Sequence, residues 1–475
     1  MNIVNKFSKE AITYGFGFLI SRSIIILLIP VYTRIFTPTE YGRIELLLQI
    51  GLLVGEFISL GMDSAQSLYF NKEKKNGLKA QSILISSIFQ LRIIWGFFLI
   101  FLISIFSNYI NLFFFQGELS YRYFIILFAG VIFSQLTSQS AEVFRLRYKP
   151  TQFVLLTSLR IIIEIPFIIY FVLKLKLGIF GYLLGTTLGY LIASIFSIYK
   201  IKNYLSLDKI HNFLWPKVLK FGLPLSIASI IFYLMNTADR FFIDIYRGEY
   251  ELGLYSVAAK LSLIISGFVY PFRNAWWPWA MDLIYKKNGN RLISEMSKIY
   301  LGISLTIMMV LSYLSPFIIR LFTTEEYYDS WKLIGILTWP IICFGFYSIC
   351  SVGIWKSEKT FYSITTNFSA AILGIILNFI LVPKFGSMGA ALATGFTFTF
   401  WVILNTFLTY KLENIILPNF ILICQASISI MFLYFSIIKN PFLEPISCLI
   451  ALIISSSICI FLGLKDRLIN KEINS

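Results

Sequence analysis

Five basic side chains lie within long apolar stretches of the sequence, where a charge is costly: Arg22, Arg92, Arg160, Lys260 and Arg273. A charged residue at the centre of a lipid-embedded helix costs roughly 2.5–3.5 kcal/mol on insertion scales, so each of the five should face protein or water. Guanidinium groups contact phosphate through two parallel hydrogen bonds. The basic interior therefore predicts a cavity that binds phosphate or acidic sugar groups.

The local neighbours of these cations differ. Arg160 has Glu164 four residues further on, so an ion pair on one helical face is expected. Arg22 and Lys260 have no carboxylate within four residues, and we expect both to line the cavity. Arg92 is assigned to the cavity as well, unless an acid elsewhere in the chain pairs with it.

Arg273 stands beside a group of tryptophans: Trp276, Trp277 and Trp279. Long basic side chains near the end of a membrane helix extend to the interface, where aromatic residues also gather. Arg273 therefore either lines the cavity or extends to the membrane surface.

Two apolar runs at mid-sequence carry polar residues at helical spacing. The run 218–245 places a set of them on one face, at steps of three and four residues: Ser226, Ser229, Tyr233, Asn236 and Arg240. The run 253–276 repeats the pattern with Ser256, Lys260, Gly267 and Asn274. We expect the two asparagines to line the same cavity as the lysine. Arg240 either serves in gating or ion coupling or is a structural cap at the outer end of its helix.

Acidic and amide side chains form further polar stripes. One stripe follows a predicted helix over 42–62 at steps of four, seven and seven residues: Glu45, Gln49, Glu56 and Asp63. Another follows the next-but-one helix: Gln135, Gln139 and Glu142. These faces suggest a hydrated cleft. Glu56 and Asp63 either couple transport to a proton or sodium gradient or pair with a nearby arginine; no other cofactor and no metal is expected.

The composition identifies a polytopic membrane protein, because 57% of the 475 residues are hydrophobic and 13% are charged, about half the usual charged share. Apolar runs of about 20 residues predict an all-α fold with about fourteen transmembrane helices. They lie near 12–33, 42–62, 80–106, 121–141, 153–174, 178–199, 218–245, 253–276, 296–320, 331–353, 361–382, 388–410, 417–437 and 444–463.

The charge distribution predicts the orientation. Basic residues are most frequent in the connections that lie inside when both termini are cytoplasmic, so the net charge of +16 is mainly a topology signal. No soluble module with a basic face is present, which argues against nucleic-acid binding. The only histidine, His211, falls in a predicted cytoplasmic loop, and no nucleophile–base pair stands out, so an enzyme is not expected.

Two halves of the chain resemble each other. The segment beginning at Gly178, GIFGYLLGT, matches GSMGAALAT at Gly386, 208 residues later. Gly15 and Arg34 match Gly222 and Arg240 at offsets of 207 and 206. We therefore predict two parallel six-helix lobes, 1–210 and 215–413, followed by two extra helices and a cytoplasmic tail in 414–475. Two such lobes with a polar seam are typical of transporters.

Several segments resemble a known family: RIFTPTEYG at 34–42, DRFFI at 239–243, LGLYSVAAKL at 252–261, PFRNAWWP at 271–278 and NFILVPKFGSMGAALAT at 378–394. Together they are similar to polysaccharide-biosynthesis flippases of the Wzx type, within the superfamily that also holds MATE antiporters and lipid II flippases. The resemblance covers nearly the whole chain and implies cavity cations in the first helix and around the seventh and eighth, where Arg22 and Lys260 fall. Arg273 fits less closely, and fourteen helices exceed the family's usual twelve.

The resemblance implies a substrate and a location. The substrate is an undecaprenyl-pyrophosphate-linked repeat unit of O-antigen or capsule, flipped across the bacterial inner membrane, with the polymerase and chain-length proteins of the pathway as further partners. A cation-coupled multidrug antiporter shares the architecture but should present carboxylates at its site, and a lipid II flippase would share the cations. A sugar-phosphate carrier of the major-facilitator kind usually has a Gly/Asp/Arg-rich loop where this chain reads FNKEKKNG at 70–77.

Overall fold

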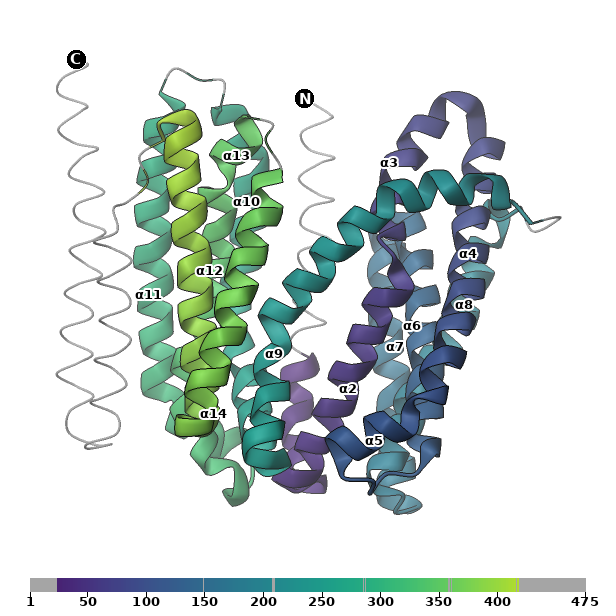
Figure 1. Cartoon of the computed structure of the whole chain (residues 1–475), viewed down its shortest axis with the longest axis vertical. Coiled ribbons are helices and arrows are strands. Elements are labelled where there is room, and N and C mark those ends of the chain that lie inside the picture. The colour runs from purple at the N-terminus through teal and green to yellow at the C-terminus, as the bar shows by residue number, and fades with distance from the viewer. Residues whose placement is uncertain are drawn as a thin grey trace. The chain divides into compact units, whose positions relative to one another are not determined.

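The chain folds into helices throughout the part that the structure describes, a computed structural model covering residues 24–147, 149–206, 210–284, 286, 288–357, 359, 361–415 and 417 (Figure 1). A short helix, Ile24–Ile35, comes first. The further α-helices are α2 Pro38–Ser59, α3 Met62–Glu73, α4 Gly77–Ile105, α5 Ser107–Phe115, α6 Tyr121–Leu146, α7 Pro150–Ile169, α8 Gly178–Ile201, α9 Trp215–Ser262, α10 Ser266–Leu283, α11 Gly289–Phe322, α12 Trp331–Cys350, α13 Val352–Lys356 and α14 Phe361–Glu413.

Eight helical segments of this part of the chain are long and apolar enough to cross a membrane. All eleven predicted spans between 42 and 410 coincide with helices, which confirms the all-α multi-pass fold. The predicted spans 417–437 and 444–463, and most of 12–33, lie outside the described residues, so the number fourteen stays a prediction.

Glycines divide two of the longest helices where the sequence predicts separate spans. Helix α9 breaks at Gly248 (φ 80°), between the predicted spans 218–245 and 253–276. Helix α14 breaks at Gly386 (φ 58°), between 361–382 and 388–410. Both glycines have left-handed backbone, which a residue with a Cβ adopts only at a cost.

The matched repeat segments share a positive φ at their first residue. Gly178 begins α8 with φ 54°, and Gly386, 208 residues later, has φ 58°. A positive φ at both matched positions agrees with the internal repeat that the sequence predicts. The proposed lobe boundaries, 1–210 and 215–413, stay a prediction.

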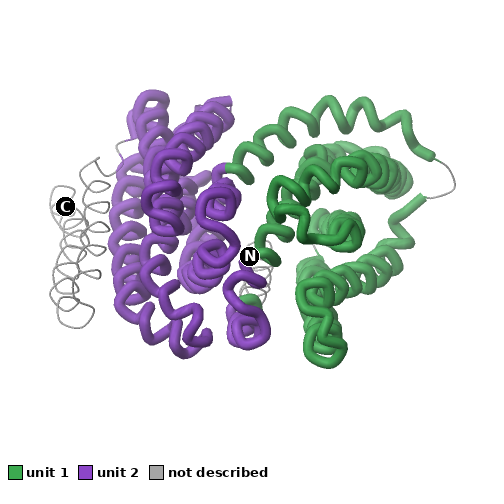
Figure 2. The backbone as a smooth tube through the Cα atoms, turned by 60° about the horizontal axis from the view of Figure 1, so that its bottom comes forward, with its two compact units in different colours: residues 1–25, 43–234 green, residues 26–42, 235–475 purple. Residues whose placement is uncertain are grey.

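The chain divides into two compact units (Figure 2). Their bounds differ from those of the predicted lobes by short segments near residues 26–42 and 215–234. Of the described residues, unit 1 holds 24–25 and 43–234, and unit 2 holds 26–42 and 235–417. The first part of α9 therefore belongs to unit 1, while the end of the first helix and the start of α2 belong to unit 2. Within unit 1, α6 and α7 pack against α8; within unit 2, α11 and α14 pack against α12.

Two ionic side chains of α9 bracket the break at Gly386 within unit 2. The Arg247 guanidinium donates to the Pro383 carbonyl at 2.7 Å, at the end of the first half of α14. The Glu251 carboxylate accepts from the Ser387 backbone N–H at 2.8 Å, at the start of the second half. A cation at a helix C-terminus and an anion at an N-terminus both interact favourably with the helix dipole.

Replacing Glu251 with alanine is expected to destabilise the protein by about 1–2 kcal/mol, because it removes the acceptor that caps the second half of α14. Thermal unfolding of the purified protein in detergent measures this. Glu325→Ala is the matched control, since Glu325 is an exposed carboxylate, and its effect should stay within about 0.5 kcal/mol. An equal loss in both variants would remove the capping role of Glu251.

Candidate functional site

The predicted site residues fall in both units. Glu56, Asp63 and Arg92 lie in unit 1. A larger group lies in unit 2: Asn236, Arg240, Lys260, Arg273 and Asn274. Arg22 lies outside the described residues. A cavity shared by the two units therefore stays a prediction, and each unit is described by itself.

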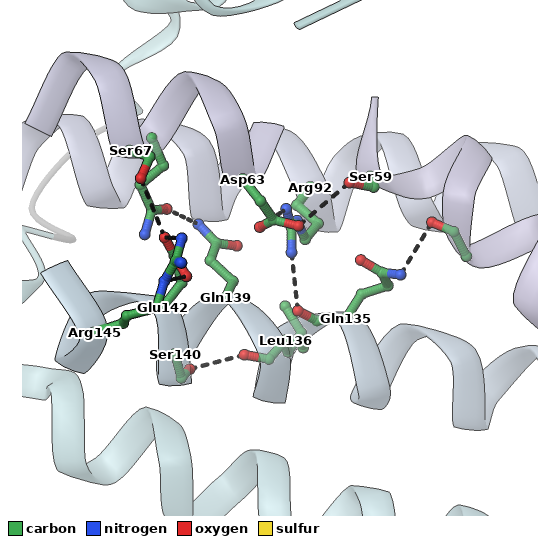
Figure 3. A network of polar contacts seen from close by, with 12 residues as sticks. Ser59, Asp63, Ser67, Arg92, Gln135, Leu136, Gln139, Ser140, Glu142 and Arg145 are labelled. Atoms are coloured by element: carbon green, nitrogen blue, oxygen red, sulfur yellow. Dashed lines mark hydrogen bonds and ion pairs between the residues drawn. The ribbon is translucent and has the colours of Figure 1, made fainter. Parts of the chain in front are cut away.

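Arg92, a buried side chain of unit 1, forms an ion pair with Asp63 (Figure 3). Its side chain, from α4, is 1% exposed, and its Nη2 lies 2.6 Å from Asp63 Oδ1. Its Nη1 donates to the Gln135 carbonyl at 3.0 Å. The sequence left the acid partner of Arg92 open, and the structure supplies it. Both terminal nitrogens of Arg92 are thus engaged within unit 1, which favours the ion-pair alternative for Arg92 over a role in substrate binding.

The predicted stripe from Glu45 to Asp63 does not follow one helix. Helix α2 ends at Ser59, and Leu60 (φ 45°) and Gly61 (φ 67°) turn the chain before α3 begins. Asp63 therefore belongs to α3, and the single-helix prediction is wrong there. Glu56 is half-buried on α2 and interacts electrostatically with Asp63 across the break.

The polar stripe of α6 meets α3 inside unit 1 (Figure 3). Gln139 donates to Gln66 at 3.2 Å, and Ser67 donates to Glu142 at 3.4 Å. Arg145 holds Glu142 through two contacts of 2.7 Å. The sequence assigned this stripe to a cleft, whereas its partners here are residues of the same unit.

Asp239 is a buried carboxylate for which the sequence predicted no role. It is 3% exposed, and its Oδ2 accepts hydrogen bonds from the Tyr255 hydroxyl and, at 3.0 Å, from the Thr394 hydroxyl. Arg240 lies 3.1 Å from Asp239 Oδ1 and donates to the Asn236 carbonyl at the same distance. A carboxylate inside a predicted span, directly before an arginine, was the available signal.

Lys260 contacts an aromatic pair in unit 2. Its Nζ donates to the Tyr41 hydroxyl at 2.9 Å and lies 4.6 Å from the centre of that ring. Tyr41 packs edge-on against Tyr327, whose hydroxyl donates to the Phe36 carbonyl at 2.8 Å. The lysine therefore sits half-buried beside the segment that begins α2, 219 residues earlier in the chain.

Arg273 stacks on an aromatic ring and has no ion pair with a carboxylate of the described residues. Its guanidinium carbon lies 3.9 Å from the centre of the Phe344 ring and 5.9 Å from that of Tyr270. Its Nε is buried and has no hydrogen-bond partner within this part of the chain. The neighbouring Asn274 is exposed. Of the predicted cavity cations, Arg273 thus presents a planar, unneutralised charge.

The fold and its buried charges define a class, that of helical multi-pass membrane proteins with charged side chains packed inside them. Residues 7–284 match the family model described as "Polysaccharide biosynthesis protein". The match covers more than half of the chain, so the chain belongs to this family.

Solved structures of two kinds share the fold. A structure titled "Lipid II flippase MurJ, inward closed conformation" has a TM-score of 0.72 at 19% identity, over 95% of this chain and 99% of that one. An inward-facing multidrug resistance MATE family transporter of the MOP superfamily has a TM-score of 0.64 at 14% identity, over 87% of this chain and 95% of that one. At these identities, the likeness concerns the fold alone.

An uncharacterized membrane protein of Methanocaldococcus jannaschii is 25% identical over 248 residues. The alignment covers 48% of this chain and 58% of that protein, so the chain matches a little over half of the relative's length.

Proposed function

We propose that this protein is a flippase that moves undecaprenyl-pyrophosphate-linked oligosaccharide repeat units, the precursors of O-antigen or capsule, from the cytoplasmic to the outer leaflet of a bacterial inner membrane. Membership of the polysaccharide biosynthesis family supports a glycan-lipid substrate. The observation that carries the proposal is Arg273, a guanidinium in an apolar helical setting that pairs with no carboxylate of the described residues. A diphosphate does not cross about 30 Å of hydrocarbon unaided, and such a cation offsets its loss of hydration.

Arg273 and Lys260 of unit 2, together with Arg22, hold the diphosphate in this proposal. The contact with Phe344 positions the Arg273 guanidinium, and we infer that its terminal nitrogens contact the phosphate oxygens. Asn236 and Asn274 would contact the glycan, while the prenyl tail stays in lipid. The two halves alternate between inward-open and outward-open states, with both termini cytoplasmic.

In this proposal, ion coupling uses carboxylates of both units. Glu56 lies next to the Asp63–Arg92 pair, and a proton on either acid changes the charge balance around Arg92. Asp239, held by Tyr255 and Arg240, offers a second such group in unit 2. The coupling ion is a proton or sodium. Polymerase and chain-length proteins of the same pathway would be the partners.

Depleting the protein in its native bacterium tests the proposal. Surface polymer should disappear, and lipid-linked repeat units should accumulate on the cytoplasmic side. A wild-type copy should restore export. Arg273→Ala should restore export about 10- to 100-fold less well, since one charge-assisted contact of roughly 1.5–3 kcal/mol is lost, while Arg273→Lys recovers part of the rate.

Membrane-inserted levels of each variant, measured by immunoblot, control for expression. Normal polymer with altered sensitivity to cationic compounds would instead indicate the multidrug antiporter. Arrest of peptidoglycan synthesis would indicate a lipid II flippase. Export by Arg273→Ala at the wild-type rate would exclude Arg273 from the site.

A further inference from the structure

A second cation, which is not among the residues of the proposed substrate-binding set, stacks on aromatic rings. Arg147 directly follows α6, and its guanidinium carbon lies 3.9 Å from the centre of the Tyr204 ring and 5.5 Å from that of Phe70. Its Nε is buried and has no hydrogen-bond partner in the described part of the chain. Stacking of this kind holds the guanidinium plane in one orientation before any ligand binds.

Lys149 adds a second cation to the same ring. Its Nζ donates to the Tyr204 hydroxyl at 3.0 Å and lies 5.7 Å from the ring centre. Tyr204 closes a short 3-10 turn after α8, Lys202–Tyr204, so three segments of unit 1 meet here: α3, the α6–α7 connection and this turn. The Tyr204 side chain therefore contacts both the Arg147 guanidinium and the Lys149 ammonium group.

No carboxylate of the described residues forms an ion pair with Arg147 or Lys149. The nearest acid along the chain, Glu142, is already held by both arms of Arg145. Burial lowers the pKa of Arg147, because the charged guanidinium is partly removed from water. An anion in contact with it would compensate for that lost hydration.

We propose that Arg147, Lys149 and Tyr204 form a binding site for the phosphodiester of an anionic glycerophospholipid at the end of α6. The guanidinium edge matches the two non-bridging phosphate oxygens, and the lysine adds a second positive charge beside them. Helix ends lie at headgroup depth, and basic pockets between membrane helices on the cytoplasmic side are a recognised mode of lipid binding. The site belongs to unit 1 alone and does not depend on what the protein transports.

Native mass spectrometry of the purified full-length protein in detergent tests the site, with added phosphatidylglycerol as the probe. Arg147→Gln is expected to weaken binding about tenfold, and Arg147→Lys by less, because charge survives but planar stacking does not. Tyr204→Phe should also weaken binding, since Lys149 loses its anchor. These measurements require no transport, so they stand or fall separately from the flippase proposal.

Lys200→Gln is the matched control. Lys200 lies 5.1 Å from one ring, that of Phe196, near the same end of unit 1, and its replacement removes the same charge. The affinity of the Lys200→Gln protein for phosphatidylglycerol should stay within twofold of the wild-type affinity. An equal loss in Lys200→Gln would mean diffuse attraction to a basic surface and would overturn the site.

Two further probes identify the ligand chemistry. Diacylglycerol lacks phosphate and should bind more weakly than phosphatidylglycerol, with the same affinity for the wild type and for Arg147→Gln. Wild-type protein that binds both lipids equally well would overturn the proposal. Undecaprenyl diphosphate is the alternative source of phosphate. If it displaces phosphatidylglycerol at equal concentration, the site binds the lipid carrier of the proposed substrate and not a glycerophospholipid, and the proposed occupant is wrong. If Arg147→Gln does not fold, Lys149→Gln supplies the same comparison.

Discussion

Replacing Asp63 with asparagine is expected to lower the free energy of unfolding by about 3 kcal/mol. The change leaves the Arg92 guanidinium, 1% exposed, buried without its counter-charge. Removing one partner of a buried ion pair typically costs 3–5 kcal/mol, because the remaining charge has lost its hydration. The lower end applies here, since the Asp63 side chain is 45% exposed. Thermal and denaturant unfolding in detergent measure the loss.

A double variant and an exposed pair complete the test. Asp63→Asn combined with Arg92→Gln removes both charges and should be less destabilising than the sum of the single changes. Asp282→Asn breaks the ion pair with Lys286, in which the aspartate side chain is 60% exposed and the lysine side chain 56%. This variant should change the free energy of unfolding by less than about 1 kcal/mol. Similar losses in Asp63→Asn and Asp282→Asn would show that the Arg92 pair is not specially stabilising.

The spans could be predicted because membrane thickness fixes their length and because a buried backbone must be helical there. The breaks at Gly248 and Gly386 also agree with the sequence, since each falls between two apolar runs. The break at Leu60–Gly61 was missed. Leucine in the left-handed region has no sequence signature, and a glycine inside a membrane helix, such as Gly55, usually stays helical.

The intramembrane charges could be found because a charge in an apolar run is unusual, but their partners could not. The pair Arg160–Glu164 was predicted because its residues are four positions apart, and the structure places Arg160 Nε 3.8 Å from Glu164 Oε2. The contact between Lys260 and Tyr41 joins residues 219 positions apart. Helical periodicity fixes which residues share a face, whereas the tertiary packing decides which helix lies opposite.

Substituting Gly253 or Gly42 with alanine is expected to destabilise the packing of unit 2 by at least about 3 kcal/mol. A Cβ on Gly253 would lie 1.9 Å from the Pro38 carbonyl oxygen, and a Cβ on Gly42 would lie 1.9 Å from that of Glu249. Both obstacles are backbone, so no side-chain rotation relieves them, and overpacking that moves backbone costs more than the usual 1–3 kcal/mol.

Gly395→Ala is the matched control for this contact. Gly395 is also a buried helical glycine, but the nearest atom to its Cβ would be Trp339 Cδ1 at 3.8 Å, an ordinary contact. Because alanine favours a helix over glycine by up to about 1 kcal/mol, this variant should be neutral or slightly stabilised in the same unfolding assay.

Since Gly42 follows Tyr41, the partner of Lys260, the Gly42 variant should also impair export in the depletion strain. Normal stability of both glycine variants would show that the helices at this contact separate without cost, and the close approach of α2 and α9 would lose its structural role.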